Sequence, residues 1–191
     1  MVCAAPSARR NVTGAADDAP FIVTAQLPAD MAKWATALRD AHFPLARNYL
    51  KAHVTLFHAL PASYADEIRT ILKQETAQAA DAQCDLVGLM SLGGGTALKL
   101  VSPQLMDIRD RLADRFHGLL TGQDSHRPRL HITIQNKVTS GAAKALQQQL
   151  ADTIRPQSFC FSGLELHIYR GGPWEFVREF KFRRSNRSFR S

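Results

Sequence analysis

The chain has 191 residues, of which 45% are hydrophobic and 21% are charged, so its composition is that of an ordinary globular protein and not of a disordered or fibrous one. Its net charge of +7 favours anionic partners, nucleic acid first, although net charge says nothing about the fold. No apolar run approaches the ~18 residues that a membrane-spanning helix requires, which excludes a helical membrane protein.

The chain divides into a leader, one domain and a basic tail. Residues 1–20 are mostly small and polar and lack the apolar core of a secretory signal, so we expect a flexible leader. Residues 21–182 are expected to form a single bilobal domain. Residues 183–191 carry four arginines and no acid, and are either a solvated tail or a contact for RNA phosphates. The three cysteines are far apart and lack a metal-ligand spacing, which indicates a reducing compartment, and we expect a cytoplasmic protein.

The first half predicts a strand, a helix, a second strand, a second helix, a hairpin and a third helix. Apolar residues at helical spacing mark the helices, and β-branched or alternating apolar residues mark the strands. Ser102 is a candidate N-cap of the third helix, with Pro103 at its first position. The expected ranges are 21–27, 28–42, 53–57, 61–78, a hairpin over 84–102 that turns at 93–95, and 102–120.

The second half repeats the order strand, helix, hairpin. The expected ranges are 129–135, a helix over 140–154 capped by Ser140, and a single hairpin over 159–182 that turns at 171–172. His53 and His131 lie 78 positions apart, and Gly88 and Gly163 lie 75 apart. Because the elements return in one order at a nearly constant offset, we interpret the chain as an internal duplication. The predicted fold class is α+β: two copies of one unit about a pseudo-twofold axis, with a cleft between two antiparallel sheets.

Both copies carry a histidine followed two residues later by a threonine, in "KAHVTLFHAL" and "RLHITIQNKV". Alternate side chains of a strand share one face, so each motif extends into a row that also holds a cation. The expected rows are Lys51, His53, Thr55 and Phe57 in the first strand, and Arg129, His131, Thr133 and Gln135 in the second. One such motif is usually structural, but two at matching places indicate a shared functional cleft. We interpret His58, His117 and His167 as structural.

Two histidines in one cleft can act as acid and base at a single pH. A neutral imidazole takes a proton from an attacking water, and a protonated one gives a proton to the departing oxygen. The threonine hydroxyls can donate to phosphate oxygens, and Lys51 and Arg129 can stabilise developing negative charge. His53 and His58 face opposite ways on a strand and cannot chelate a metal together, so we expect no metal and no cofactor.

The two motifs resemble the HxTx motifs of the 2H phosphoesterase superfamily, and the layout from about residue 21 to 182 resembles its 2′-5′ RNA ligase-like branch. The resemblance implies a bilobal fold with the motifs on adjacent central strands. It also implies a metal-independent activity on 2′,3′-cyclic phosphates or 2′-5′ linkages, with reverse ligation as the same chemistry. It assigns catalysis to His53 and His131, phosphate binding to Thr55 and Thr133, and base stacking to Phe57.

A second cluster of candidate residues lies at the tip of the last hairpin, in "YRGGPWEF". Tyr169 and Trp174 could stack on bases and Arg170 could pair with a phosphate, or the aromatic residues could simply pack across the hairpin. We expect a monomer that binds RNA ends or small cyclic nucleotides. The alternative is a binding module that holds a nucleotide in the same cleft without turnover; the completeness of both motifs favours the enzyme.

Overall fold

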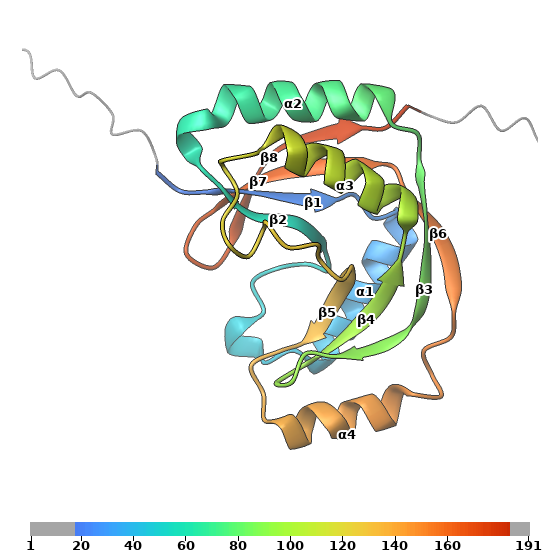
Figure 1. Cartoon of the computed structure of the whole chain (residues 1–191). Helices are drawn as coiled ribbons and strands as arrows, with labels where there is room; N and C mark the ends of the chain where they lie inside the picture. Colours follow the sequence, from blue (N-terminus) through green and yellow to red (C-terminus); the bar gives the residue numbers. More distant parts are fainter. Residues whose placement is uncertain (1–17, 184–191) are drawn as a thin grey trace, which may run out of the picture.

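The strands form two antiparallel four-stranded sheets in the computed structural model, which describes residues 18–183 (Figure 1). Most of the predicted leader and tail, residues 1–17 and 184–191, lie outside the described residues. The first sheet has the order β2 (Val54–Leu60), β1 (Phe21–Ala25), β7 (Gly163–Tyr169) and β8 (Trp174–Lys181). The second has the order β5 (His131–Gln135), β4 (Thr96–Val101), β3 (Ala82–Ser91) and β6 (Gln157–Phe161). The predicted α+β fold with two antiparallel sheets is confirmed.

The helices cover the sheets from different sides (Figure 1). Helix α2 (Ala65–Gln78) contacts β7 and β8 of the first sheet and also α3 (Pro103–Arg115), whereas α4 (Ser140–Leu150) contacts β3 and β4 of the second. Helix α1 (Ala29–His42) packs against β5, so the N-terminal helix lies beside the second motif strand. No helix in residues 18–183 has the length and apolar character needed to cross a membrane.

The last predicted hairpin is in fact divided between the two sheets. β6 pairs with β3 in the second sheet, and the chain then crosses to the first sheet at Ser162 and Gly163, where β7 begins. A side chain at Gly163 would place its Cβ 2.5 Å from the backbone oxygen of Phe180, so only glycine permits this close approach. The prediction of one hairpin over 159–182 is therefore wrong at its first strand.

The helix caps are partly as predicted. The Ser102 hydroxyl accepts a hydrogen bond from Leu105 N at 3.3 Å, and Pro103 follows it, as expected for the start of α3. Helix α4 is capped by Thr139 and not by Ser140, because the Thr139 hydroxyl accepts from Ala142 N at 3.2 Å. Ser140 is instead the first residue of the helix.

Each motif strand bulges one residue after its threonine. In β2, Thr55 pairs with Thr24 and Phe57 pairs with Val23, which leaves Leu56 without an opposite residue. In β5, Thr133 pairs with Ala97 and Gln135 pairs with Thr96, which leaves Ile134 unopposed. A bulge breaks the alternation of side chains. Leu56 and Phe57 are consequently both buried, as are Ile134 and Gln135, and the predicted extension of the two polar rows to Phe57 and Gln135 is wrong.

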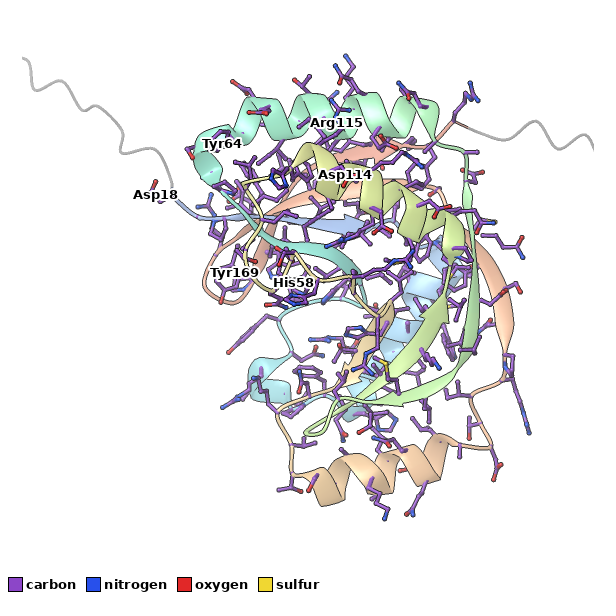
Figure 2. The ribbon with its side chains drawn as sticks, in the orientation of Figure 1. Asp18, His58, Tyr64, Asp114, Arg115 and Tyr169 are labelled. Carbon is purple, nitrogen blue, oxygen red and sulfur yellow. The ribbon has the colours of Figure 1, made fainter. Side chains whose placement is uncertain are left out.

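A buried carboxylate joins the first motif strand to the loop that leads into the second. Asp124 is 2% exposed and accepts hydrogen bonds from His58 N at 2.9 Å, Ala59 N at 3.0 Å and His58 Nδ1 at 2.9 Å. Its backbone oxygen accepts from the buried Arg109 guanidinium of α3. Burial works to raise the pKa of Asp124, but the hydrogen bonds from His58 and Ala59 outweigh it and hold the pKa below its usual value. Figure 2 shows His58 where β2 meets this loop.

Replacing Asp124 by alanine should therefore lower the free energy of unfolding by about 1.5–3 kcal/mol, because buried backbone donors of an edge strand lose a charged acceptor. The measurement is urea unfolding at neutral pH. Asp107→Ala, at an exposed carboxylate of α3, is the matched control and should change the value by less than ~0.5 kcal/mol. An Asp124→Ala protein as stable as the parent would show that the carboxylate does not join the two segments.

Candidate functional site

The two motif histidines are held in the same way by the backbone. His53 Nδ1 lies 2.8 Å from the carbonyl oxygen of Lys51, and His131 Nδ1 lies 2.7 Å from that of Arg129. A carbonyl can only accept, so in each ring Nδ1 carries the proton and Nε2 has the lone pair when the ring is neutral. The residue two positions before each histidine thus contributes its carbonyl group to the motif.

His53 is held in its neutral form. Its pKa is lowered to about 4, chiefly by burial and in smaller part by the electrostatic effects of Arg39, His167 and His131, while the hydrogen bond to the Lys51 carbonyl works in the opposite direction. His53 is therefore neutral at pH 7. His131 is one of the groups that affect the pKa of His53, so the two imidazoles lie within electrostatic range of each other. They come from different sheets: His131 begins the edge strand β5, and His53 immediately precedes the edge strand β2. Strands β2 and β5 contact each other, so the implied adjacency holds, but neither is a central strand.

A cavity of about 840 Å³ opens on one side of His53. Its walls come from α1, from the segment before β2, and from β1, β7 and β8. The centre of the Trp174 ring lies 4.5 Å from that of the His53 ring and 5.7 Å from that of the His167 ring. Lys33 and Lys51 supply positive charge to the walls, and Asp40 and Glu165 supply negative charge. This volume is in the range of small-molecule sites.

The predicted cations separate. Lys51 lines the cavity beside His53, whereas Arg129 lines another hollow of about 530 Å³ with Lys99 and Arg127. The equivalence of the two motifs therefore holds for the backbone carbonyls of Lys51 and Arg129 and not for their side chains. Thr55 and Thr133 both remain half-buried at the ends of the regular pairing, next to their histidines.

The predicted stacking role of Phe57 is wrong. Its side chain is fully buried, packs edge-on against Phe116 at 5.4 Å between centroids, and carries the Arg109 guanidinium over its ring at 5.0 Å. No base can reach it without unfolding the core. The bulge at Leu56 turns the ring inward, away from the face that holds Thr55.

The three hairpin residues reach different surroundings. Trp174 contacts His53 and lines the cavity. Arg170 forms hydrogen bonds to Glu175 at 2.6 and 2.7 Å, so its guanidinium is already engaged by a carboxylate. Tyr169 is 42% exposed and lies across the hairpin from Trp174, as Figure 2 shows at the end of β7.

Two residues near His53 were missed at the level of sequence. His167, interpreted as structural, lines the cavity, and its Nε2 lies within hydrogen-bonding distance of Thr24 Oγ1 at 3.2 Å. The alternation of Glu165, His167 and Tyr169 along β7 was a usable signal. Arg39 was overlooked because it follows an apolar helical stripe, although an arginine on that stripe is itself unusual. Met31, Ala35 and Arg39 are all buried on one face of α1.

The arrangement is suited to acid–base chemistry. Two imidazoles present Nε2 with a fixed tautomer, and one of them is neutral at pH 7 because of its surroundings. Within residues 18–183, no three histidine, cysteine, aspartate or glutamate side chains gather in a group that could bind a metal ion. The cavity itself offers a ligand the imidazoles of His53 and His167, threonine hydroxyls, charges of both signs and the Trp174 ring. The side chains of Thr55, His131 and Thr133 are not among its lining residues.

Comparisons with known proteins agree with this geometry. A sequence profile of the 2′-5′ RNA ligase superfamily matches residues 27–173. No curated protein sequence matches the chain. Among solved structures, Escherichia coli LigT complexed with 3′-AMP is 16% identical with a TM-score of 0.62, and TT0787 of Thermus thermophilus is 14% identical with a TM-score of 0.62. Each match covers 87% of this chain and 99% of the other.

LigT has also been crystallised with NADP+, in a structure that is 15% identical to this chain with a TM-score of 0.59. At these identities the structural matches show a shared fold. The profile match spans most of the chain and includes both histidine motifs, with their bulged strands and carbonyl-held imidazoles. The chain therefore belongs to the 2′-5′ RNA ligase superfamily, a group of two-histidine phosphoesterases.

Proposed function

We propose that the protein is a metal-independent phosphodiesterase that acts on 2′,3′-cyclic phosphates or 2′-5′ linkages of RNA or nucleotides. The observation that carries the proposal is the equivalent anchoring of His53 and His131 through Nδ1, which leaves the Nε2 atom of each ring for proton transfer. The printed ligands of LigT, 3′-AMP and NADP+, support a nucleotide as the bound species. Free cysteines at Cys84 and Cys160 support the cytoplasm as its location.

The neutral state of His53 suggests which histidine is the base. His53 Nε2 takes a proton from a water molecule whose oxygen attacks phosphorus. The bond from phosphorus to one ribose oxygen of the cyclic phosphate breaks, and protonated His131 gives its Nε2 proton to that oxygen. Thr55 and Thr133 donate to the non-bridging oxygens, and Lys51 stabilises the added negative charge. With a ribose 5′-hydroxyl in place of water, the same steps form a 2′-5′ linkage.

The cavity beside His53 is the proposed place for a nucleoside. Its Trp174 wall offers a flat aromatic surface for a base, and Lys51 lines the same cavity beside His53, the proposed phosphate position. RNA ends and small cyclic nucleotides both present this combination of base and phosphate. The basic segment from Arg183 onward is the proposed contact for longer RNA.

The second candidate function is nucleotide binding without turnover. It uses the same cavity and the same two histidines without proton transfer. The neutral, carbonyl-anchored His53 favours the enzyme, because a binder of anionic phosphate would gain from a protonated imidazole at this position. Turnover of nucleoside 2′,3′-cyclic phosphates in the presence of a chelator separates the two candidates.

Replacing His53 or His131 by alanine should each lower kcat by roughly 10²–10⁴, the usual contribution of a positioned acid or base. The double variant should lose less than the product of the two, because the pair acts as a unit. The assay is hydrolysis of a nucleoside 2′,3′-cyclic phosphate with chelator present. His117→Ala, at an exposed histidine, is the control. Near-normal turnover by either single variant would contradict paired acid–base catalysis.

The dependence of kcat/KM on pH should be bell-shaped. Its acidic limb should lie near pH 4, because protonation of His53, whose pKa burial lowers to about 4, removes the base as pH falls. The basic limb should report loss of the proton from the catalytic acid. The measurement is kcat/KM from pH 3.5 to 9, with stability checked at each end. An acidic limb that persists in His53→Ala residual activity would assign it to another group.

Trp174→Ala should weaken substrate binding by about 1–3 kcal/mol if a base stacks on the ring, and this should appear mainly in KM. Trp174→Phe keeps an aromatic surface and should retain most of the affinity. Tyr169→Ala tests the other predicted stacking residue, and an equal rise in KM there would place the base outside the cavity. An unchanged KM in Trp174→Ala would remove stacking on this wall from the proposal.

A further inference from the structure

Arg39 ends the buried stripe of α1 and reaches both histidine motifs. Its side chain belongs to a residue that is only 4% exposed. Nε donates to Asn48 Oδ1 at 2.8 Å and to the Leu50 carbonyl at 2.9 Å, and Nη1 donates to the Thr133 carbonyl at 3.0 Å. One guanidinium therefore bonds the segment before His53 and the strand that begins with His131.

The acceptors of Arg39 lie close to the groups that orient the histidines. Leu50 immediately precedes Lys51, whose carbonyl holds His53 Nδ1. Thr133 is the threonine of the second motif, two residues after His131. These segments are far apart in sequence: one leads into β2 of the first sheet and the other is β5 of the second, and α1 lies beside β5 (Figure 1). A shift of the guanidinium would therefore move one motif relative to the other.

The position requires an arginine in particular. Its planar fork donates in several directions at once, which the single ammonium group of a lysine cannot reproduce. The acceptors are neutral oxygens, and the guanidinium also lies 3.9 Å from the centre of the Phe43 ring. Asn48 links Arg39 to Asp40, since its Oδ1 accepts from Arg39 and its Nδ2 donates to Asp40 Oδ1 at 2.7 Å. Burial lowers the pKa of Arg39 while Asp40 raises it.

Burying a guanidinium on the packed face of a helix is energetically unfavourable, because the charge loses its hydration. Leucine or methionine would fill the same stripe without the cost of desolvating a charge. The charge also lies close to His53, where it adds to the effect of burial in disfavouring the protonated ring. The other groups that act on His53 are His131 from β5 and His167 from β7, with Lys51 and Glu165 in the same cavity.

We propose that Arg39 is a positioning residue, whose guanidinium fixes the segment before His53 against the strand of His131 and so sets the distance between the two imidazoles. It does not touch the substrate. The inference rests on the proposed function, because its readout is turnover of a cyclic phosphate. A purely structural role for Arg39 would change stability alone, whereas the positioning role also predicts a defined change in the pH dependence of kcat/KM.

The experiment compares Arg39→Met and Arg39→Lys with Arg47→Met, which removes an exposed arginine from the segment between α1 and β2. Arg39→Met should lower kcat by about 10–100-fold, the cost of a small misplacement of reacting groups. KM should change less. The acidic limb of the kcat/KM profile of Arg39→Met should move to higher pH, because loss of a positive charge favours protonated His53. Arg39→Lys should also lose kcat but keep the acidic limb. Arg47→Met should match the parent.

Urea unfolding of each variant separates positioning from stability. If Arg39→Met does not fold, the kcat of Arg39→Lys decides. Parental kcat in Arg39→Lys, or an unmoved acidic limb in a folded Arg39→Met, would overturn the inference while leaving the proposed function intact. An inactive parent protein would instead overturn the proposed function.

Discussion

The hydrogen bond from each histidine Nδ1 to a carbonyl two residues earlier is the constraint on which the site depends. It fixes the tautomer and the ring orientation in both motifs with backbone atoms alone, at 2.8 and 2.7 Å. The side chains of Lys51 and Arg129 can then diverge without affecting the imidazoles. The bulge after each threonine belongs to the same design, because it ends the polar row and returns the following side chains to the core.

Much of the frame could be predicted from the sequence because its signals are local. Periodicity located the helices and most strands, and the constant offset of the motifs predicted two similar halves. The crossing at Gly163 was missed because β6 and β7 are continuous apolar segments, and only the close approach of Phe180 shows why glycine is there. Thr139 and Ser140 are both good caps, and local preference could not choose between them.

The site was predicted less completely, for physical reasons. Strict alternation placed Phe57 and Gln135 beside the histidines, but a bulge depends on pairing with a partner strand and leaves little trace in one strand's sequence. The cavity is built from α1, β1, β7 and β8, so its existence depends on tertiary packing. Arg39 acts through carbonyl oxygens of Leu50 and Thr133, and backbone acceptors have no sequence signature.

The two motifs supply two equivalently anchored histidines, yet acid–base catalysis needs two different ones. The difference comes from what surrounds His53: Trp174 against its ring, and His167 and the Arg39 charge close enough to affect its pKa. These groups lie on elements outside the HxTx strand itself, so they could diverge while the motif stayed fixed. An asymmetric environment around an equivalently anchored pair can thus give identical side chains the opposite proton-transfer roles that the proposed mechanism requires.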